Sequence, residues 1–119
     1  MFINWIIELY ETENGYKPIE DFFDSLNIKI HVKAVKEIAI LKELGISIKE
    51  PYSKHLKDGV LELRIKLASD IARISHFFYV EKKIILTNGF IKKMQKTPHL
   101  ELEKALKYKA DYERRNSND

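Results

Sequence analysis

Alternating apolar and polar residues in the second half of the chain constrain the fold most. In residues 60–67, VLELRIKL, every second side chain is apolar, which is the period of a strand with one buried face. Residues 71–79 and 83–91 are two further apolar stretches, and each follows the previous one after a short turn. Strands joined this tightly must be antiparallel neighbours, because a parallel return needs a long crossover. The sequence therefore predicts a three-stranded antiparallel meander.

The first half of the chain predicts one strand and two helices. Residues 2–10 alternate like a strand. Pro18 suits the first turn of a helix, and a second helix is expected over residues 29–44, with Gly45 as its C-terminal cap. Its apolar stripe is expected to be the buried face, formed by Val32, Val35, Ile38 and Ala39.

The C-terminal segment predicts a third helix, from Pro98 to about Arg114, with Thr97 as its N-cap. The predicted order is β-α-α-β-β-β-α within a single domain, residues 1–119. This is an α+β fold, in which a curved antiparallel sheet packs against two N-terminal helices and a C-terminal helix. We also expect Phe90 to be buried against the helices.

Composition narrows the possible chemistry. The chain has no cysteine, no Gly-rich phosphate loop and no metal-ligand spacing among its four histidines, so neither a cofactor nor a metal is expected. No apolar run is long enough for a membrane helix, and the start of the chain lacks the pattern of a secretory signal. The sequence therefore predicts a cytoplasmic protein with no membrane partner.

Positive charge is concentrated in the second half of the chain. Residues 1–53 hold six Lys and Arg against nine Asp and Glu, whereas residues 54–119 hold fifteen against nine. The predicted meander would place Arg64, Lys66 and Arg73 on one face, with lysines where the last strand ends. Such a face is either an ordinary solvated surface or a cleft for a polyanion, and the near absence of carboxylates favours the cleft.

Four motifs give the chain a family resemblance. They are G-x-x-P-I-x-x-F at residues 15–22, K-x-L-x-x-G-x-x-E-L-R at 54–64, A-R-I at 72–74, and G-F-x-K-K-x-Q-K-T-P at 89–98. The combination resembles the phage-Gp49-like, HigB branch of the RelE/ParE-type toxins, and it extends over almost the whole chain.

The resemblance implies a RelE-like fold and the toxin of a type II toxin–antitoxin system. It further implies a ribosome-dependent, metal-independent endoribonuclease that cleaves mRNA and inhibits translation. The implied partners are the ribosome, mRNA and a cognate antitoxin, often a helix-turn-helix protein, in a hetero-oligomeric complex.

The resemblance also assigns candidate site residues. The catalytic candidates are Arg64, Lys66, Arg73, Lys93 and His55. Further basic residues in the second half of the chain are candidates for RNA binding, namely Lys54, Lys57, Lys92, Lys96, Arg114 and Arg115. The proton carrier stays open among His55, Lys66, Tyr108 and Tyr112.

Two other functions are compatible with the sequence. ParE-type relatives are understood to act on DNA gyrase without nuclease activity, and they generally lack the full basic set. A non-catalytic RNA-binding module would bind RNA without cleaving it. The basic cluster favours RNA over gyrase.

Overall fold

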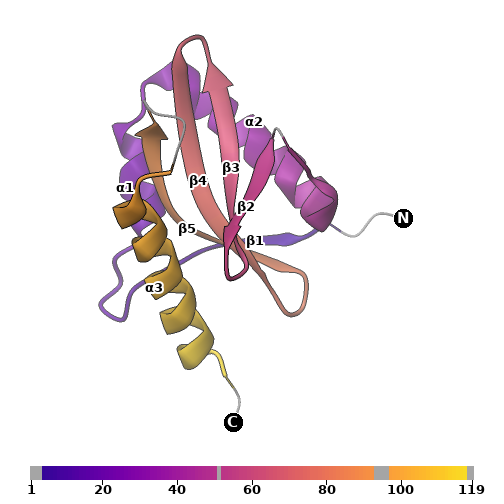
Figure 1. Cartoon of the computed structure of the whole chain (residues 1–119), viewed down its shortest axis with the longest axis vertical. Helices are drawn as coiled ribbons and strands as arrows, with labels where there is room; N and C mark the ends of the chain where they lie inside the picture. The colour runs from indigo at the N-terminus through magenta and orange to yellow at the C-terminus, as the bar shows by residue number, and fades with distance from the viewer. Residues whose placement is uncertain (1–3, 51, 93–96, 118–119) are drawn as a thin grey trace.

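The computed structural model describes residues 4–50, 52–92 and 97–117 of the 119-residue chain. Figure 1 shows a twisted sheet with helices on both of its faces. The elements in chain order are β1 (Ile6–Leu9), α1 (Pro18–Ser25), α2 (Ile28–Leu44), a short 3-10 turn (Gly45–Ser47), β2 (Ser53–Lys57), β3 (Val60–Leu67), β4 (Asp70–Tyr79), β5 (Lys83–Lys92) and α3 (His99–Arg115). The predicted α+β class is confirmed, as is the antiparallel meander β3-β4-β5.

The sheet is mixed, so the prediction of an entirely antiparallel sheet is wrong. Its strand order is β1-β5-β4-β3-β2, and β1 pairs with β5 in parallel, from Ile6 opposite Lys83 to Leu9 opposite Leu86. Helices α1 and α2 and strands β2, β3 and β4 separate β1 from β5 along the chain. That separation supplies the long connection that a parallel pair requires.

The edge strand β2 is absent from the predicted order. Its sequence, SKHLK, has no apolar alternation, and only Ser53 is buried. The strand is held by backbone pairing with β3 through the two-residue turn Asp58-Gly59, in which both residues have positive φ. An Asp-Gly pair is a strong hairpin signal, so the sequence did contain an indication of this strand.

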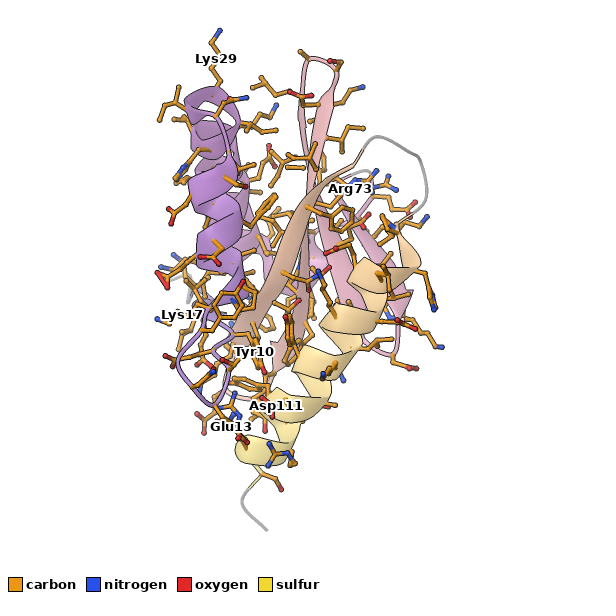
Figure 2. The ribbon with its side chains drawn as sticks, turned by 90° about the vertical axis from the view of Figure 1, so that its left-hand side faces the viewer. Tyr10, Glu13, Lys17, Lys29, Arg73 and Asp111 are labelled. Carbon is orange, nitrogen blue, oxygen red and sulfur yellow. The ribbon has the colours of Figure 1, made fainter. Side chains whose placement is uncertain are left out.

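The helices lie on opposite faces of the sheet. In Figures 1 and 2, α1 and α2 lie on one side of the sheet and α3 on the other. The larger core lies under α1 and α2, where Leu63 and Ile65 of β3 pack against residues such as Ile19 and Leu41. A smaller aromatic cluster lies under α3 and contains Tyr10, Phe77, Ile85 and Tyr112. Of the helices in the described residues, none is long and apolar enough to span a membrane.

The buried face of α2 differs from the predicted stripe. Ile30, Ala34 and Leu41 are buried. Of the predicted stripe, Ile38 packs against the core, whereas Val32, Val35 and Ala39 are exposed. Apolar residues occupy most of the circumference of this helix, so their spacing alone allowed more than one buried face. Contact with β3 selected the face that is buried.

The position of Phe90 also differs from the prediction. A side chain at Gly89 would meet the ring of Phe22 on α1, so it is Gly89 that faces the first two helices. Side chains alternate along a strand, and Phe90 therefore lies on the other face, opposite Arg73 of β4, where it is half-buried.

Candidate functional site

Charged residues gather on the face of β3 and β4 that points away from α1 and α2. Glu62, Arg64 and Lys66 share this face of β3, because Leu63 and Ile65 between them pack into the larger core. Cross-strand pairing puts Arg73 directly beside Arg64. The meander therefore brings together the basic residues that the sequence assigned to one face.

Glu62 is the centre of this cluster, and it is fully buried. One carboxylate oxygen accepts a hydrogen bond from the Arg73 guanidinium, and the other accepts one from the hydroxyl of Thr97. The Arg64 Nε atom lies 3.8 Å from the same carboxylate. Two arginines thus share one carboxylate, which leaves net positive charge at this position.

Thr97 does not cap α3 as predicted. The N-cap is Pro98, which has no side-chain capping bond, and the Thr97 hydroxyl binds Glu62 instead. A hydrogen bond to an ionised carboxylate is stronger than one between neutral groups, which favours this arrangement over a helix cap. The bond ties the segment before α3 to the centre of β3.

The two arginines differ in their access to solvent. The Arg73 side chain is buried, whereas 28% of the Arg64 side chain is exposed. The Nε atoms of both are shielded from solvent and have no hydrogen-bond partner among the described residues. A ligand entering from solvent would therefore reach Arg64 first, while Arg73 is held in place by Glu62.

A pocket of about 350 Å³ opens beside these arginines. It is lined by Lys33, Glu37, Tyr52, Arg64, Lys66, Ile71 and Arg73. Among the described residues, β2 pairs with β3 only from Val60 to Leu63, so the part of β3 beyond Arg64 has no strand partner on this side and forms a free edge next to α2. The Arg64 backbone N–H donates to the carbonyl of Tyr52 at 2.8 Å and holds Tyr52 at the pocket.

Three residues that line the pocket, Lys33, Glu37 and Tyr52, carry no signal in the sequence that marks them as site residues. Lys33 and Glu37 lie on α2, far from β3 along the chain, and Tyr52 follows the helix-to-strand connection. Their meeting depends on how α2 packs against the sheet, and no local pattern encodes that. The i, i+4 spacing of Lys33 and Glu37 indicates only that they share a helix face.

The β2 candidates are divided between the two faces of the sheet. Lys54 is exposed and pairs with Glu62, so it shares the face of the cluster. His55 pairs with Leu61 and therefore lies on the opposite face, where its Nε2 atom accepts a hydrogen bond from the Gly59 N–H at 3.3 Å. Lys57 is exposed near the turn into β3. The structure thus brings Lys54 to the cluster face and does not bring His55 there.

The structure describes one of the three candidate lysines at the end of β5. Lys92 ends β5 and pairs with Ile71, whose other neighbour is Lys66. Lys93 and Lys96 lie outside the described residues.

Arg114 and Arg115 lie at the opposite end of the molecule from the pocket. Figure 2 shows Tyr10, Glu13 and Asp111 together near the C-terminal part of α3, well separated from Arg73. Ion pairs to Asp111 hold both arginines, and Arg114 also binds Glu13 at 2.8 Å.

The candidate tyrosines belong to the aromatic cluster under α3. Tyr108 stacks on Tyr10 with ring centroids 4.7 Å apart, and Tyr112 contacts Phe77 and Tyr79 edge to face. Burial raises the pKa of Tyr112, and the nearby Glu8 carboxylate raises it further. Neither tyrosine lines the pocket beside Arg64.

His76 is the one buried histidine among the described residues, and it packs on the α2 side of β4. Desolvation lowers its pKa to about 4, which keeps the imidazole neutral at physiological pH. Its Nδ1 atom lies 3.2 Å from the Ile74 carbonyl, and its ring meets Phe78 edge to face. His76 is therefore part of the core. Within the described ranges, no group of three or more His, Asp and Glu residues could hold a metal ion.

These features define an α+β protein with a cationic pocket at the free edge of a mixed sheet. Residues 21–110 match the phage-derived Gp49-like protein family (DUF891), and the chain belongs to this family. The family is part of the RelE/HigB-like toxin group and is related to RelE-like toxin endoribonucleases. Membership identifies a toxin–antitoxin-related protein with a cognate antitoxin as its expected partner. No curated protein is similar enough to the chain to count as a match.

Proposed function

We propose that this chain is a HigB-branch toxin with a RelE-like fold that cleaves mRNA on the ribosome and so inhibits translation. The observation that carries the proposal is the pocket beside Arg64 and Lys66, where Lys33 and Arg73 add positive charge that Glu37 and the buried Glu62 offset only in part. Guanidinium and ammonium groups fixed on a sheet suit the phosphate backbone of RNA.

The proposed reaction is an internal phosphoryl transfer. The ribose 2′-oxygen forms a bond to the adjacent phosphorus, and the bond from phosphorus to the 5′-oxygen of the next nucleotide breaks. The 2′-hydroxyl loses a proton, the departing 5′-oxygen gains one, and the products are a cyclic phosphate and a 5′-hydroxyl. Fixed cations can stabilise the charge that develops on the phosphoryl oxygens, so the step requires no metal.

The geometry suggests different roles for the two arginines. Arg64 is partly exposed at the pocket and would contact the reacting phosphate. Arg73 is buried and bound to Glu62, so it would position Glu62 and Arg64 and strengthen the local positive field. Both arginines are catalytic candidates by resemblance, and in this proposal only Arg64 contacts the phosphate directly.

Lys66 is the proposed proton carrier. Of the four candidates, it is the one that lines the pocket, where it is exposed. His55 lies on the other face of the sheet, and the two tyrosines belong to the aromatic cluster under α3. Lys54, Lys57, Lys92, Lys93 and Lys96 would bind RNA phosphates on either side of the cleaved bond.

The protein is further proposed to act in the cytoplasm and to be inhibited in a hetero-oligomeric complex with its antitoxin, a helix-turn-helix protein. The ion pairs of Arg114 and Arg115 occupy both guanidinium groups, so these residues would contribute little to RNA binding.

An in vitro translation reaction tests the proposal. Purified protein is added to ribosomes translating a defined message, and the new RNA ends are mapped and examined for a 5′-hydroxyl. We expect cleavage within ribosome-bound message and none in the same message without ribosomes. Intact message in stalled ribosomes would exclude the nuclease. Unaffected translation together with DNA damage signalling in cells would favour the gyrase alternative.

A further inference from the structure

We propose that the pocket at the free edge of β3 is a nucleobase subsite that selects guanine. The Glu37 carboxylate would accept hydrogen bonds from the base, the Tyr52 ring would stack on it, and Arg64 and Lys66 would hold its phosphate. The inference rests on the proposed function in one respect, namely that the ligand is RNA.

One carboxylate oxygen of Glu37 without a partner is the central observation. Its Oε2 atom is shielded from solvent and accepts no hydrogen bond from any described residue. Lys33 lies one turn away on α2 and lines the same pocket, yet no ion pair joins the two side chains within the described part of the chain. A carboxylate oxygen without water or a donor is costly, and donors supplied by a ligand would remove that cost.

The pocket has the size and the aromatic surface that a base requires. Its volume of about 350 Å³ falls within the range of small-molecule sites. Tyr52 at its rim is 57% exposed, and its backbone is fixed by the hydrogen bond from Arg64. Unpaired RNA bases commonly stack on such a ring while their Watson–Crick edges form hydrogen bonds.

The charges are arranged for a nucleotide and not for a phosphate alone. Arg64, Lys66 and Lys33 supply positive charge, whereas Glu37 would repel a phosphate placed against it. A ligand with an anionic group at one end and hydrogen-bond donors at the other satisfies both parts of the pocket.

Guanine is the base that fits a carboxylate best. Its N1–H and N2–H groups are adjacent donors on one edge, so both can bind one carboxylate. Adenine and cytosine offer an amino group beside a ring nitrogen acceptor, and uracil offers one N–H between two carbonyls. Each of these places an acceptor against the carboxylate, which is unfavourable.

A binding titration that needs no ribosome tests the inference. The full chain is titrated, with NMR detection, with the 3′-monophosphates of guanosine, inosine and adenosine. Inosine keeps N1–H and lacks the amino group at C2, so this comparison isolates one hydrogen bond to a charged group. We expect guanosine to bind about tenfold more tightly than inosine. Equal affinities for the two in the unmodified chain would overturn the proposal.

Two matched variants on α2 test whether the preference for guanosine over inosine depends on Glu37. Glu37→Gln should abolish most of the preference for guanosine over inosine, whereas Glu43→Gln, an exposed site outside the pocket, should leave it unchanged. Ribose 5-phosphate, which has no base, should bind both variants equally. A guanosine preference that survives in Glu37→Gln would contradict the role of Glu37.

The outcome separates this inference from the proposed nuclease activity. Cleavage of ribosome-bound message with no guanosine preference in the titration would overturn the guanine subsite and leave the nuclease intact. A guanosine preference in a protein that leaves messages intact would support the subsite and exclude the nuclease.

Discussion

Two regions at opposite ends of the molecule each hold two arginines near a carboxylate, but they differ in charge balance and burial. At the pocket end, Arg64 and Arg73 share the buried Glu62, and Lys66 adds a further positive charge. At the other end, Asp111 pairs with both Arg114 and Arg115, and Glu13 adds a second carboxylate. One end keeps net positive charge in a pocket, whereas the other neutralises its charge at an exposed surface.

This difference shows why counting cations along the chain does not locate a site. Arg114 and Arg115 contribute to the basic second half of the sequence as much as Arg64 and Arg73 do. Exposed ion pairs contribute little to stability and leave little charge for a ligand. The buried ion pair of Arg73 and Glu62, with Arg64 beside it, is costly to maintain, which favours a functional explanation.

Removal of Glu62 should produce the largest loss of stability. Glu62→Ala leaves the buried Arg73 without its partner, and we expect the free energy of unfolding to fall by about 3–5 kcal/mol. Urea unfolding at neutral pH measures the change, with Arg114→Ala as the control from the exposed end. A midpoint for Glu62→Ala equal to that of the control would show that the buried pair is not formed.

The next largest effect is expected on RNA cleavage, which should depend on the pocket end and not on the exposed end. Arg64→Ala removes a donor at the pocket, and we expect single-turnover cleavage on saturated ribosomes to fall by about 10²–10³. Arg64 is a better test than Arg73, because removing Arg73 also unpairs Glu62 and destabilises the fold. Lys107→Ala on α3 is the control and should change cleavage little. Similar small losses in both variants would place the active site elsewhere.

The two ends should also respond to acid in different pH windows. His76 lies beside the Glu62 end, and its pKa is lowered by burial from 6.5 to about 4. The unfolded chain therefore binds this proton more readily than the folded chain does. The stability that the neutral His76 contributes is fully present above pH 6.5 and is lost as the pH falls towards 4. The loss should be about 3 kcal/mol. Urea unfolding of the unmodified chain and of His76→Leu between pH 7 and 4.5 measures it. A slope that persists unchanged in His76→Leu would assign the effect to another group.

The smallest effect of pH on stability is expected at the exposed end, and it should occur at a lower pH than the effect of His76. The Tyr10 hydroxyl and the two arginines lower the pKa of Asp111 to about 2. A depressed carboxylate pKa stabilises the fold above its ordinary value of 3.8, and this contribution is lost as the pH falls towards 2. Thermal unfolding of Asp111→Asn should differ slightly from the unmodified chain above pH 4 and converge with it below that pH. Added salt should reduce the difference. A salt-independent difference would show that the network is shielded from solvent.

Local patterns in the sequence determined the meander and the starts and ends of most helices. The apolar alternation of β3 defines one buried face, Pro18 begins α1, and Gly45 ends α2. Each of these signals involves residues within a few positions of one another. At that range, backbone sterics and the alternation of side chains determine the local structure directly. For the same reason the sequence placed Arg64, Lys66 and Arg73 on one face correctly.

Tertiary structure decided the features that depend on distant partners. Edge strand β2 pairs through its backbone, β1 joins β5 across most of the chain, and contact with the sheet chooses the buried face of α2. Thr97 binds Glu62 in preference to capping α3, and Glu37 and Tyr52 meet Arg64 only when α2 is packed. Periodicity cannot encode these contacts, because the free energy that selects them comes from burial and charge pairing between segments far apart along the chain.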